Sequence, residues 1–160
     1  IIGLGAIGRR VAEIARAFGA KVIYYSASGA PAQEGYEQVD FETLLTQSDI
    51  ISVHAPLNEH TEGLINSKAF EKMKSSCIFL NLGRGPIVDE QALYNALVRN
   101  QIAAAGLDVL CKEPMSADNP LLKIKDSKRL LITPHIAWAS VEARTHLMEI
   151  IHGQVKDFFA

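Results

Sequence analysis

Three residues of this sequence carry side chains suited to acid–base chemistry and anion binding, namely Arg84, Glu113 and His135. A histidine can give a proton to a carbonyl oxygen and take it back, because its ordinary pKa of ~6.5 lies near neutral pH. A carboxylate on the far ring nitrogen would orient that imidazole and favour its protonated form. The planar guanidinium matches the two oxygens of a substrate carboxylate, which a lysine would not. This combination suits reduction of a 2-keto acid by hydride.

Each of the three residues also has an ordinary structural interpretation. Arg84 lies between two glycines and could be a solvated turn residue, whereas Glu113 precedes a proline and could be a loop carboxylate. His135 follows Pro134 and could be a buried, hydrogen-bonded histidine. All three nevertheless follow segments that read as strands, and open α/β sheets bind their ligands at the carboxyl ends of the strands. Their common position favours the functional interpretation.

A glycine motif, Gly3-x-Gly5-x-x-Gly8, stands between a first apolar segment and a first helical pattern. We expect Gly3 to permit a tight turn, Gly5 to let a pyrophosphate approach the backbone, and Gly8 to let helix and strand pack closely. The helix N-terminus behind the motif attracts an anion. The motif therefore predicts a dinucleotide site.

The residue expected to contact the adenosine ribose is Ser26, where domains that prefer NAD usually carry Asp or Glu. Without a carboxylate, nothing repels a 2′-phosphate, and no Arg or Lys follows Ser26 closely to attract one. The choice between NAD and NADP stays open at this point, with NAD the first expectation.

Short apolar runs alternate with helical patterns, which predicts an α/β fold: a Rossmann doubly wound parallel sheet with helices on both faces. The strands expected are 1–4, 21–25, 50–54, 77–82, 104–109 and 130–133, with a weaker one near 37–39. The helices expected are 7–18, 41–47, 68–73, 90–100 and 140–159, with caps at Asp40, Asn66 or Ser67, and Asp89. The apolar face of the first helix is expected to comprise Ile7, Val11, Ile14, Ala15 and Phe18, and that of the last Leu147, Met148, Ile151, Val155 and Phe158.

The bulk composition fits one globular domain of 160 residues, 48% of them hydrophobic and 21% charged. The net charge of −2 gives no reason to expect a nucleic acid or an anionic membrane as a partner. No apolar run approaches the ~18 residues of a spanning helix. Cys77 and Cys111 have no metal-ligand or redox spacing, so we expect no metal and a cytoplasmic location. Because the sequence opens on Ile1 within an apparent strand, we also expect it to be a fragment of a longer protein.

Three longer segments carry a family resemblance. They are Asn81–Asp89 (NLGRGPIVD), Gly106–Val109 continuing to Glu113-Pro114, and Thr133–Trp138 (TPHIAW). In this order they resemble the D-isomer-specific 2-hydroxyacid dehydrogenases, and the similarity covers essentially all 160 residues. It implies that Arg84, Glu113 and His135 are the catalytic set, that a 2-keto or 2-hydroxy acid is the substrate, and that the protein is a homodimer.

The resemblance also implies that Asp108 positions the nicotinamide and that the loop after residue 53 lines the cofactor site. The full set of cofactor-binding residues expected is Gly3, Gly5, Ala6, Ile7, Gly8, Ser26, His54, Ala55, Pro56, Thr61, Leu82, Gly83, Arg84, Asp108, His135 and Ala137.

The segment Asp118–Leu122 (DNPLL) and Trp138 look most similar to the glycerate dehydrogenase, or hydroxypyruvate reductase, branch. Phosphoglycerate dehydrogenase and a dinucleotide-sensing, co-repressor-like interaction module are the alternatives. Formate dehydrogenase resembles the family with Gln where Glu113 stands. Family members add a separate substrate domain that this sequence does not encode, so we expect these 160 residues alone to bind dinucleotide and to turn over little substrate.

Overall fold

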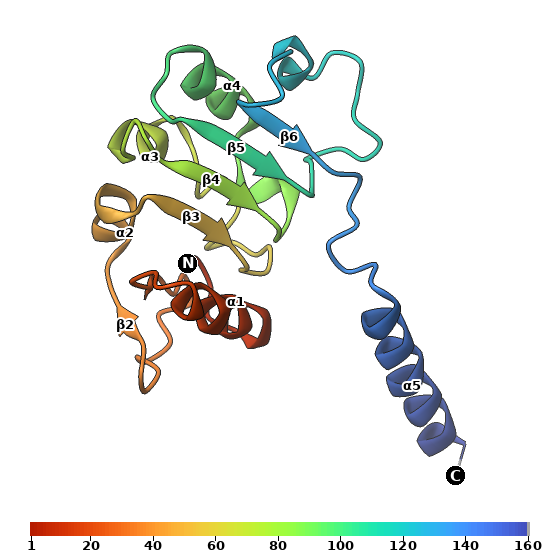
Figure 1. Cartoon of the computed structure of the whole chain (residues 1–160). Helices are drawn as coiled ribbons and strands as arrows, with labels where there is room; N and C mark the ends of the chain where they lie inside the picture. Colours follow the sequence, from red (N-terminus) through yellow and green to blue (C-terminus); the bar gives the residue numbers. More distant parts are fainter. Residues whose placement is uncertain (160) are drawn as a thin grey trace.

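A parallel sheet forms the centre of the computed structural model, which describes residues 1–159. Its four main strands lie side by side in the order β3, β4, β5, β6 (Figure 1). Their bounds are Ile50–Val53, Ile78–Asn81, Ala104–Leu107 and Leu130–Ile132. All three pairings are parallel, so the carboxyl ends of the four strands meet at one edge of the sheet.

The first residues of the chain extend this sheet on the β3 side. Ile2 makes single parallel bridges to Val53 and to Tyr25, the residue after β1 (Ile23–Tyr24). On its other side β1 pairs in parallel with β2 (Glu37–Gln38). The chain thus runs from Ile2 outward to β1 and β2, and then crosses back to β3 on the opposite side. This reversal of strand order confirms the doubly wound Rossmann arrangement.

The first strand is shorter than expected over residues 1–4. Only Ile2 pairs, because the chain turns at Gly3, which has a φ of +87°. Glycine adopts this left-handed conformation without the steric cost that a Cβ would add. The turn that ends the strand early is the one that the glycine motif predicts.

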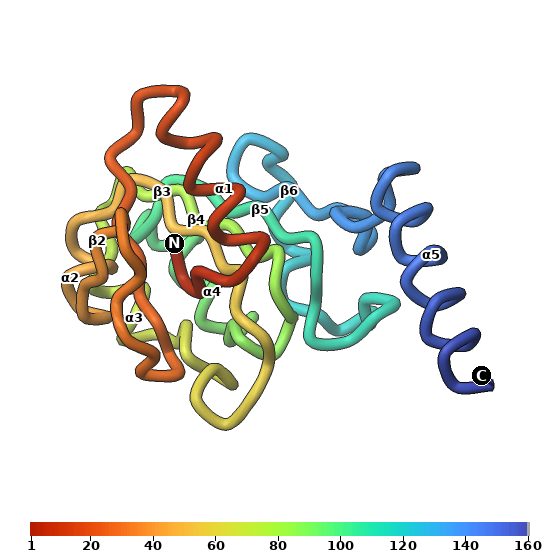
Figure 2. Tube along the Cα trace, turned by 90° about the horizontal axis from the view of Figure 1, so that it is seen from below, coloured from red at the N-terminus to blue at the C-terminus, as the bar shows by residue number. Residues whose placement is uncertain are grey.

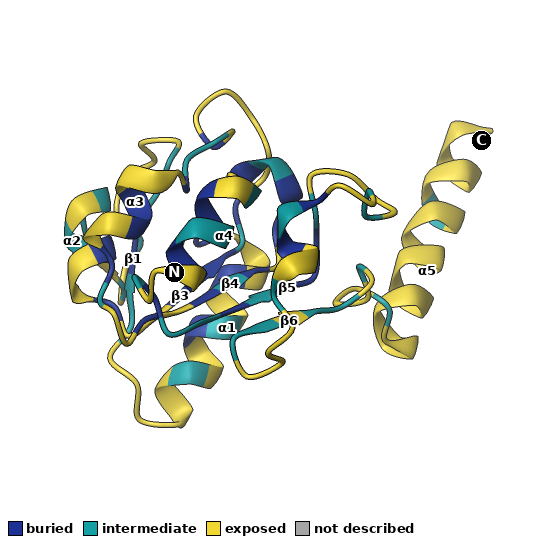
Figure 3. Cartoon of the chain, turned by 90° about the horizontal axis from the view of Figure 1, so that it is seen from above, coloured by how far each residue is buried: buried dark blue, intermediate teal, exposed yellow. Residues whose placement is uncertain are grey.

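Three helices cover one face of the sheet, and their N-termini are capped by residues that the sequence analysis names. They are α2 (Phe41–Gln47), α3 (Ser67–Lys72) and α4 (Glu90–Val98), and Figure 3 shows them together on one side. Side-chain oxygens of Asp40, Asn66 and Asp89 accept backbone N–H bonds from the first turns. Such caps satisfy N–H groups that a helix leaves without partners.

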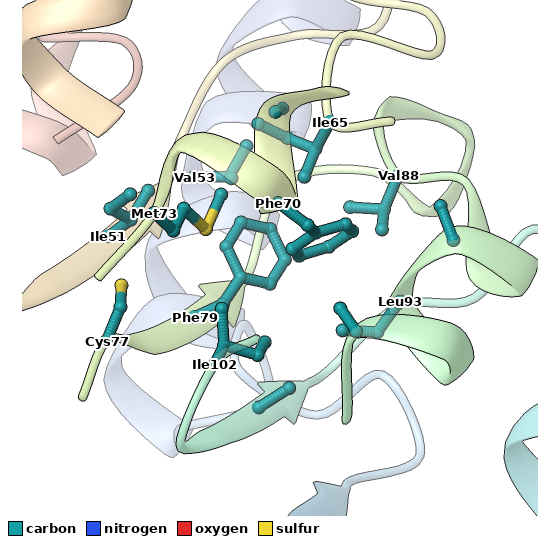
Figure 4. Close-up of a cluster of buried hydrophobic side chains, with 14 of the residues drawn as sticks. Ile51, Val53, Ile65, Phe70, Met73, Cys77, Phe79, Val88, Leu93 and Ile102 are labelled. Atoms are coloured by element: carbon teal, nitrogen blue, oxygen red, sulfur yellow. The ribbon is translucent and has the colours of Figure 1, made fainter. Parts of the chain in front are cut away.

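The core lies between these helices and the sheet (Figure 4). Phe70 of α3 and Phe79 of β4 are fully buried and meet edge to face, with ring centroids 5.6 Å apart. Leu93 of α4 and Ile102, just before β5, are also buried. This packing fixes the positions of β3, β4 and β5, whose carboxyl ends carry the loops of the candidate site.

The helix α1 (Ala6–Ala17) lies on the opposite face (Figure 3), and its expected contact face is only partly right, because Val11 and Ala15 are half-buried but the other members are exposed. Its buried residues are Gly8 and Ala12, whereas Ile7 and Phe18 are 69% and 89% exposed. Glycine and alanine allow the helix backbone to approach the sheet closely, so the small residues face inward and the large apolar ones face outward.

The last helix, α5 (Val141–Phe158), extends away from the rest of the molecule (Figures 1 and 2). Ser140 caps it, and none of its residues is buried. The apolar residues expected to form its contact face are therefore exposed in this chain, including Met148 at 63%. No helix within the described residues has the length and apolar character needed to cross a membrane.

Candidate active site

Glu113 and His135 form a direct hydrogen-bonded pair. The His135 Nδ1 atom lies 2.8 Å from Oε2 of Glu113, and Oε1 of the same carboxylate accepts the Leu110 N–H at 2.9 Å. The Leu110 N–H and then the His135 ring hold the pKa of Glu113 below its ordinary value, so the group is a carboxylate near neutral pH. Both side chains remain accessible, at 38% and 39% exposure. The bond at Nδ1 leaves Nε2 of His135 as the ring nitrogen available to a substrate.

The backbone around His135 is fixed by Asp108, at the end of β5. Its two carboxylate oxygens accept bonds from the Thr133 hydroxyl at 2.6 Å and from the N–H groups of Ile136 and Ala137 at 2.9 and 2.8 Å. His135 has a φ of +53°, in the left-handed region that residues other than glycine rarely adopt. The bonds on either side of His135 determine this conformation.

Asp108 is itself buried, with 6% exposure. Burial opposes its ionisation, but the bonds from Thr133, Ala137 and Ile136 together outweigh that effect and hold the pKa of Asp108 below its ordinary value. The charge therefore acts on the backbone of the histidine loop. Its expected contact with the nicotinamide stays a prediction.

Arg84 follows β4 but does not join the Glu113–His135 pair. Its Nη1 donates to the carbonyl of Gly83 at 2.8 Å, and over residues 1–159 no hydrogen bond or ion pair links it to either partner. The buried Asn81 holds this loop, because its side chain donates to the Arg84 carbonyl and accepts the Gly83 N–H. The structure thus brings two of the three predicted catalytic residues into contact.

The three residues nevertheless share one edge of the sheet. Arg84 follows β4, Glu113 follows β5 and His135 follows β6, and these strands are neighbours. A hollow of about 810 Å³ adjoins the pair, with Asp108, Glu113 and His135 in its lining and mostly apolar side chains elsewhere. A small organic acid could approach this edge from outside the carboxyl ends of the strands, as ligands do in open α/β sheets.

The glycine loop has the geometry that a dinucleotide needs. A Cβ on Gly3 would lie 2.9 Å from the Ala55 backbone, and one on Gly8 would lie 2.1 Å from the Gly3 carbonyl. Both glycines are thus required by packing. A Cβ on Gly5 would meet nothing within 4 Å, and no side chain caps α1, which begins after Gly5. The helix N-terminus is open to a pyrophosphate, so these residues fit the cofactor that the motif predicts.

Ala55 joins the cofactor loop to the arginine loop. Its backbone touches the Cβ position of Gly3, and its carbonyl oxygen would lie 2.9 Å from a Cβ on Gly83. Three loops, which follow the first strand, β3 and β4, therefore meet with backbone against backbone. This contact explains why glycine is needed at both positions.

The predicted ribose contact, Ser26, follows Tyr25, whose carbonyl accepts the Gly3 N–H at 3.0 Å. Ser26 thus lies next to the glycine loop, and its contact with the ribose stays a prediction. Its hydroxyl is 3.2 Å from that of Ser28.

A cation that was not predicted from the sequence lies close to this loop. Arg9, on the first turn of α1, points its Nη1 to within 3.4 Å of Oε1 of Gln33, and Gln33 in turn donates to the Leu4 carbonyl at 2.8 Å. No Arg or Lys follows Ser26 closely at the end of the second strand, whereas this cation comes from the helix.

The loop after β3 is ordered by its own polar groups. The His54 ring lies 2.8 Å from the Ser52 hydroxyl, and burial lowers the pKa of His54, so its ring is neutral near pH 7. The buried Thr61 donates to the Pro56 carbonyl at 2.7 Å and accepts the Asn58 N–H at 2.9 Å. These contacts shape the loop, and its contact with a cofactor stays a prediction. The other expected cofactor residues, Ala6, Ile7, Leu82 and Ala137, are exposed.

Neither cysteine has the environment of a nucleophile. Burial, foremost, raises the pKa of Cys77 to about 11, and burial together with Glu90 raises that of Cys111 to about 11. Thiols with such pKa values remain protonated near pH 7.

Comparisons with known proteins identify the family. Residues 1–137 match the model of the D-isomer specific 2-hydroxyacid dehydrogenase, NAD binding domain. The chain belongs to this family. A hydroxypyruvate reductase of Blautia hydrogenotrophica is 46% identical over 160 residues, which are 99% of this chain and 49% of that protein. A D-3-phosphoglycerate dehydrogenase of Archaeoglobus fulgidus is 46% identical over 154 residues, 94% of this chain and 29% of that protein.

A solved structure of an acyclic imino acid reductase (Bsp5) in complex with NADPH and D-Arg superposes with a TM-score of 0.88 at 40% identity, over 99% of this chain and 49% of that one. The chain thus spans about half the length of the first curated relative and of this structure. For this 2-hydroxyacid dehydrogenase domain, the predicted fold, family and nicotinamide cofactor class are confirmed, and solved relatives carry NAD, NADP or NADPH.

Proposed function

We propose that this dehydrogenase domain serves an enzyme that reduces a small 2-keto acid with a nicotinamide dinucleotide, with hydroxypyruvate and D-glycerate as the favoured pair. The observation that carries the proposal is the 2.8 Å bond between Glu113 and His135 at the carboxyl edge of the sheet. A histidine held by a carboxylate at one ring nitrogen can transfer a proton at the other.

The proton step is assigned to His135. A nicotinamide held at the glycine loop would supply or accept the hydride at the substrate's C2 carbon. Nε2 of His135 gives its proton to the carbonyl oxygen during reduction and takes it back during oxidation, while Glu113 stabilises the imidazolium from Nδ1. Asp108 acts on the backbone that carries the histidine.

Arg84 is proposed to bind the substrate carboxylate. Its guanidinium uses Nη1 for the Gly83 carbonyl, which leaves the other N–H groups for two carboxylate oxygens. Its exposed position on the loop after β4, beside the glycine-rich turn, supports this role.

We further propose that the enzyme is a cytoplasmic homodimer. Both cysteines are free thiols, which suits a reducing compartment. The exposed apolar residues of α5 would suit a contact with another protein surface.

The experiment that tests the function is an NADH- and NADPH-linked assay of the enzyme with glyoxylate, hydroxypyruvate, pyruvate and phosphohydroxypyruvate. We expect the highest kcat/KM with hydroxypyruvate, and no reduction of any of the four acids would refute the proposal. The similarity to a D-3-phosphoglycerate dehydrogenase makes that activity the second candidate. A kcat/KM for phosphohydroxypyruvate above that for hydroxypyruvate would favour it.

A further inference from the structure

Glu90 lies on the first turn of α4, outside the residues assigned above, and holds both ends of a loop of the candidate site. Its Oε1 accepts the N–H of Cys111 at 2.8 Å, and its Oε2 accepts Nδ2 of Asn119 at 2.7 Å. The chain leaves β5 at Leu107, four positions before Cys111, and reaches η2 (Pro120–Lys123) just after Asn119. A single carboxylate therefore closes the loop at its base.

The two ends that Glu90 holds are themselves fixed. Asn119 is buried, with 6% exposure, and its Oδ1 accepts the N–H of Leu121 in η2 at 2.9 Å. At the other end, a Cβ on Gly85 would lie 2.0 Å from the Leu110 carbonyl group, so the start of the loop rests directly on η1 (Gly85–Ile87). The loop base is thus clamped between the N-terminus of α4 and the turn before it.

Glu113 lies within this loop and depends on its base. Its Oε1 accepts the N–H of Leu110, the residue next to Cys111, and its Oε2 meets the His135 ring. A shift of the loop base would displace the Leu110 N–H and the Glu113 carboxylate together. Displacements of about 1 Å in an active site can reduce rates by about a hundredfold.

We propose that Glu90 is a positioning residue, which fixes the 111–119 loop so that the Glu113 carboxylate meets Nδ1 of His135. Over residues 1–159 no hydrogen bond or ion pair joins Glu90 to Glu113 or His135, so its effect passes through Cys111 and Asn119. The proposal rests on the function proposed above, because it gives Glu90 a share in orienting the proton-transferring histidine.

The positioning role of Glu90 must be separated from simple stabilisation of α4 by a first-turn charge. An acidic residue in the first turn stabilises a helix through the helix dipole, wherever the rest of the side chain points. Glu142 is the matched control, because it occupies the first turn of α5 and is exposed. Glu142→Gln removes a first-turn charge without touching the candidate site.

The variant that tests the proposal is Glu90→Gln. Its amide keeps the size of the side chain, but only its oxygen can accept, so its NH₂ group opposes one of the two donors. Two measurements follow: the downfield NMR resonance of the His135 Nδ1 proton in this chain, and kcat and KM of the enzyme. A purely structural role would not move the resonance.

We expect Glu113→Gln and Glu90→Gln to weaken or abolish that resonance, and Glu90→Gln to lower kcat about tenfold with a change in the nucleotide KM of less than about twofold. Glu142→Gln should leave both unchanged. If Glu90→Gln does not fold by circular dichroism, Asn119→Ser, which removes one of the two bonds, is measured in the same way.

An unchanged resonance and kcat in Glu90→Gln, beside a lost resonance in Glu113→Gln, would overturn the positioning role and leave the proposed function intact. Full activity of both Glu113→Gln and His135→Ala would instead refute the proposed function. Even if the proposed function failed, the His135 Nδ1 resonance would still show whether Glu90 positions Glu113. Failure of the positioning role and failure of the proposed function are therefore distinguishable.

Discussion

The two ends of the sheet's carboxyl edge are built in opposite ways. At the cofactor end, which is the glycine loop, the shape depends on residues without a side chain. Gly3 and Gly8 let backbone segments pack directly against each other. At the catalytic end, the shape depends on carboxylates. Asp108 accepts hydrogen bonds from the backbone that follows His135, and Glu90 accepts hydrogen bonds from both ends of the 111–119 loop. Substitutions at the cofactor end should therefore act through steric conflict, and substitutions at the catalytic end through the loss of charge and hydrogen bonds.

The largest effect should come from the catalytic end, where His135→Ala removes the proposed proton donor. We expect kcat to fall by about 10²–10⁴, the usual contribution of a positioned acid–base group. The Kd for NADH, measured by fluorescence, should change little. His146→Ala, on the exposed surface of α5, is the control and should keep full activity. Near-normal turnover of His135→Ala would exclude the assigned role.

A smaller effect at the same end is expected from Asp108→Asn. An amide cannot replace a carboxylate that accepts three bonds, so we expect about 1.5–3 kcal/mol less stability in urea unfolding at pH 7. Asp118→Asn, in an exposed part of the 111–119 loop, is the control.

The pH dependence of the difference in unfolding free energy between wild type and Asp108→Asn tests whether the Asp108 charge causes it. Because the folded-state pKa of Asp108 lies below the ordinary value of 3.8, its stabilisation is complete above that value and is lost as pH falls through the lower, folded-state pKa. The gap between wild type and Asp108→Asn should therefore narrow in acid. A gap that stays constant down to pH 2 would contradict this explanation.

At the cofactor end, two alanine variants should separate packing from binding. Gly8→Ala places a methyl group 2.1 Å from the Gly3 carbonyl and should cost about 1–3 kcal/mol in unfolding free energy. Gly5→Ala meets no protein atom within 4 Å, so it should fold normally and yet bind NADH about tenfold more weakly, because its methyl group meets the pyrophosphate. Equal Kd values for wild type and Gly5→Ala would show that the pyrophosphate lies elsewhere.

An effect of the same size as that of Gly5→Ala, but confined to one of the two cofactors, is expected from a charge placed at the cofactor end. Ser26→Asp puts a carboxylate beside the ribose position and should weaken NADPH binding about tenfold, or about 1.4 kcal/mol, through repulsion of the 2′-phosphate. NADH binding should change much less. The control Ser26→Asn has the same size without the charge. A parallel loss of both cofactors in Ser26→Asp would mean that the residue does not face the ribose.

The same contrast explains what the sequence could predict. Spacing along the chain determines the glycine loop, the caps at Asp40 and Asp89, and the alternation of strands and helices, because each is a local pattern. The orientation of α1 was not predictable from its apolar residues, since the close approach at Gly8 decided it. The contact of Glu90 with residues 21 and 29 positions away depends on how separate elements pack.

The backbone conformation of His135 restricts which residues this position accepts. Glycine, asparagine, aspartate and histidine occupy the left-handed region more readily than other residues do. Of these four, only histidine ordinarily titrates near neutral pH. The local chain geometry and the proton chemistry thus select the same amino acid independently, and His135→Asn, which tolerates that geometry, would remove the chemistry while sparing the turn.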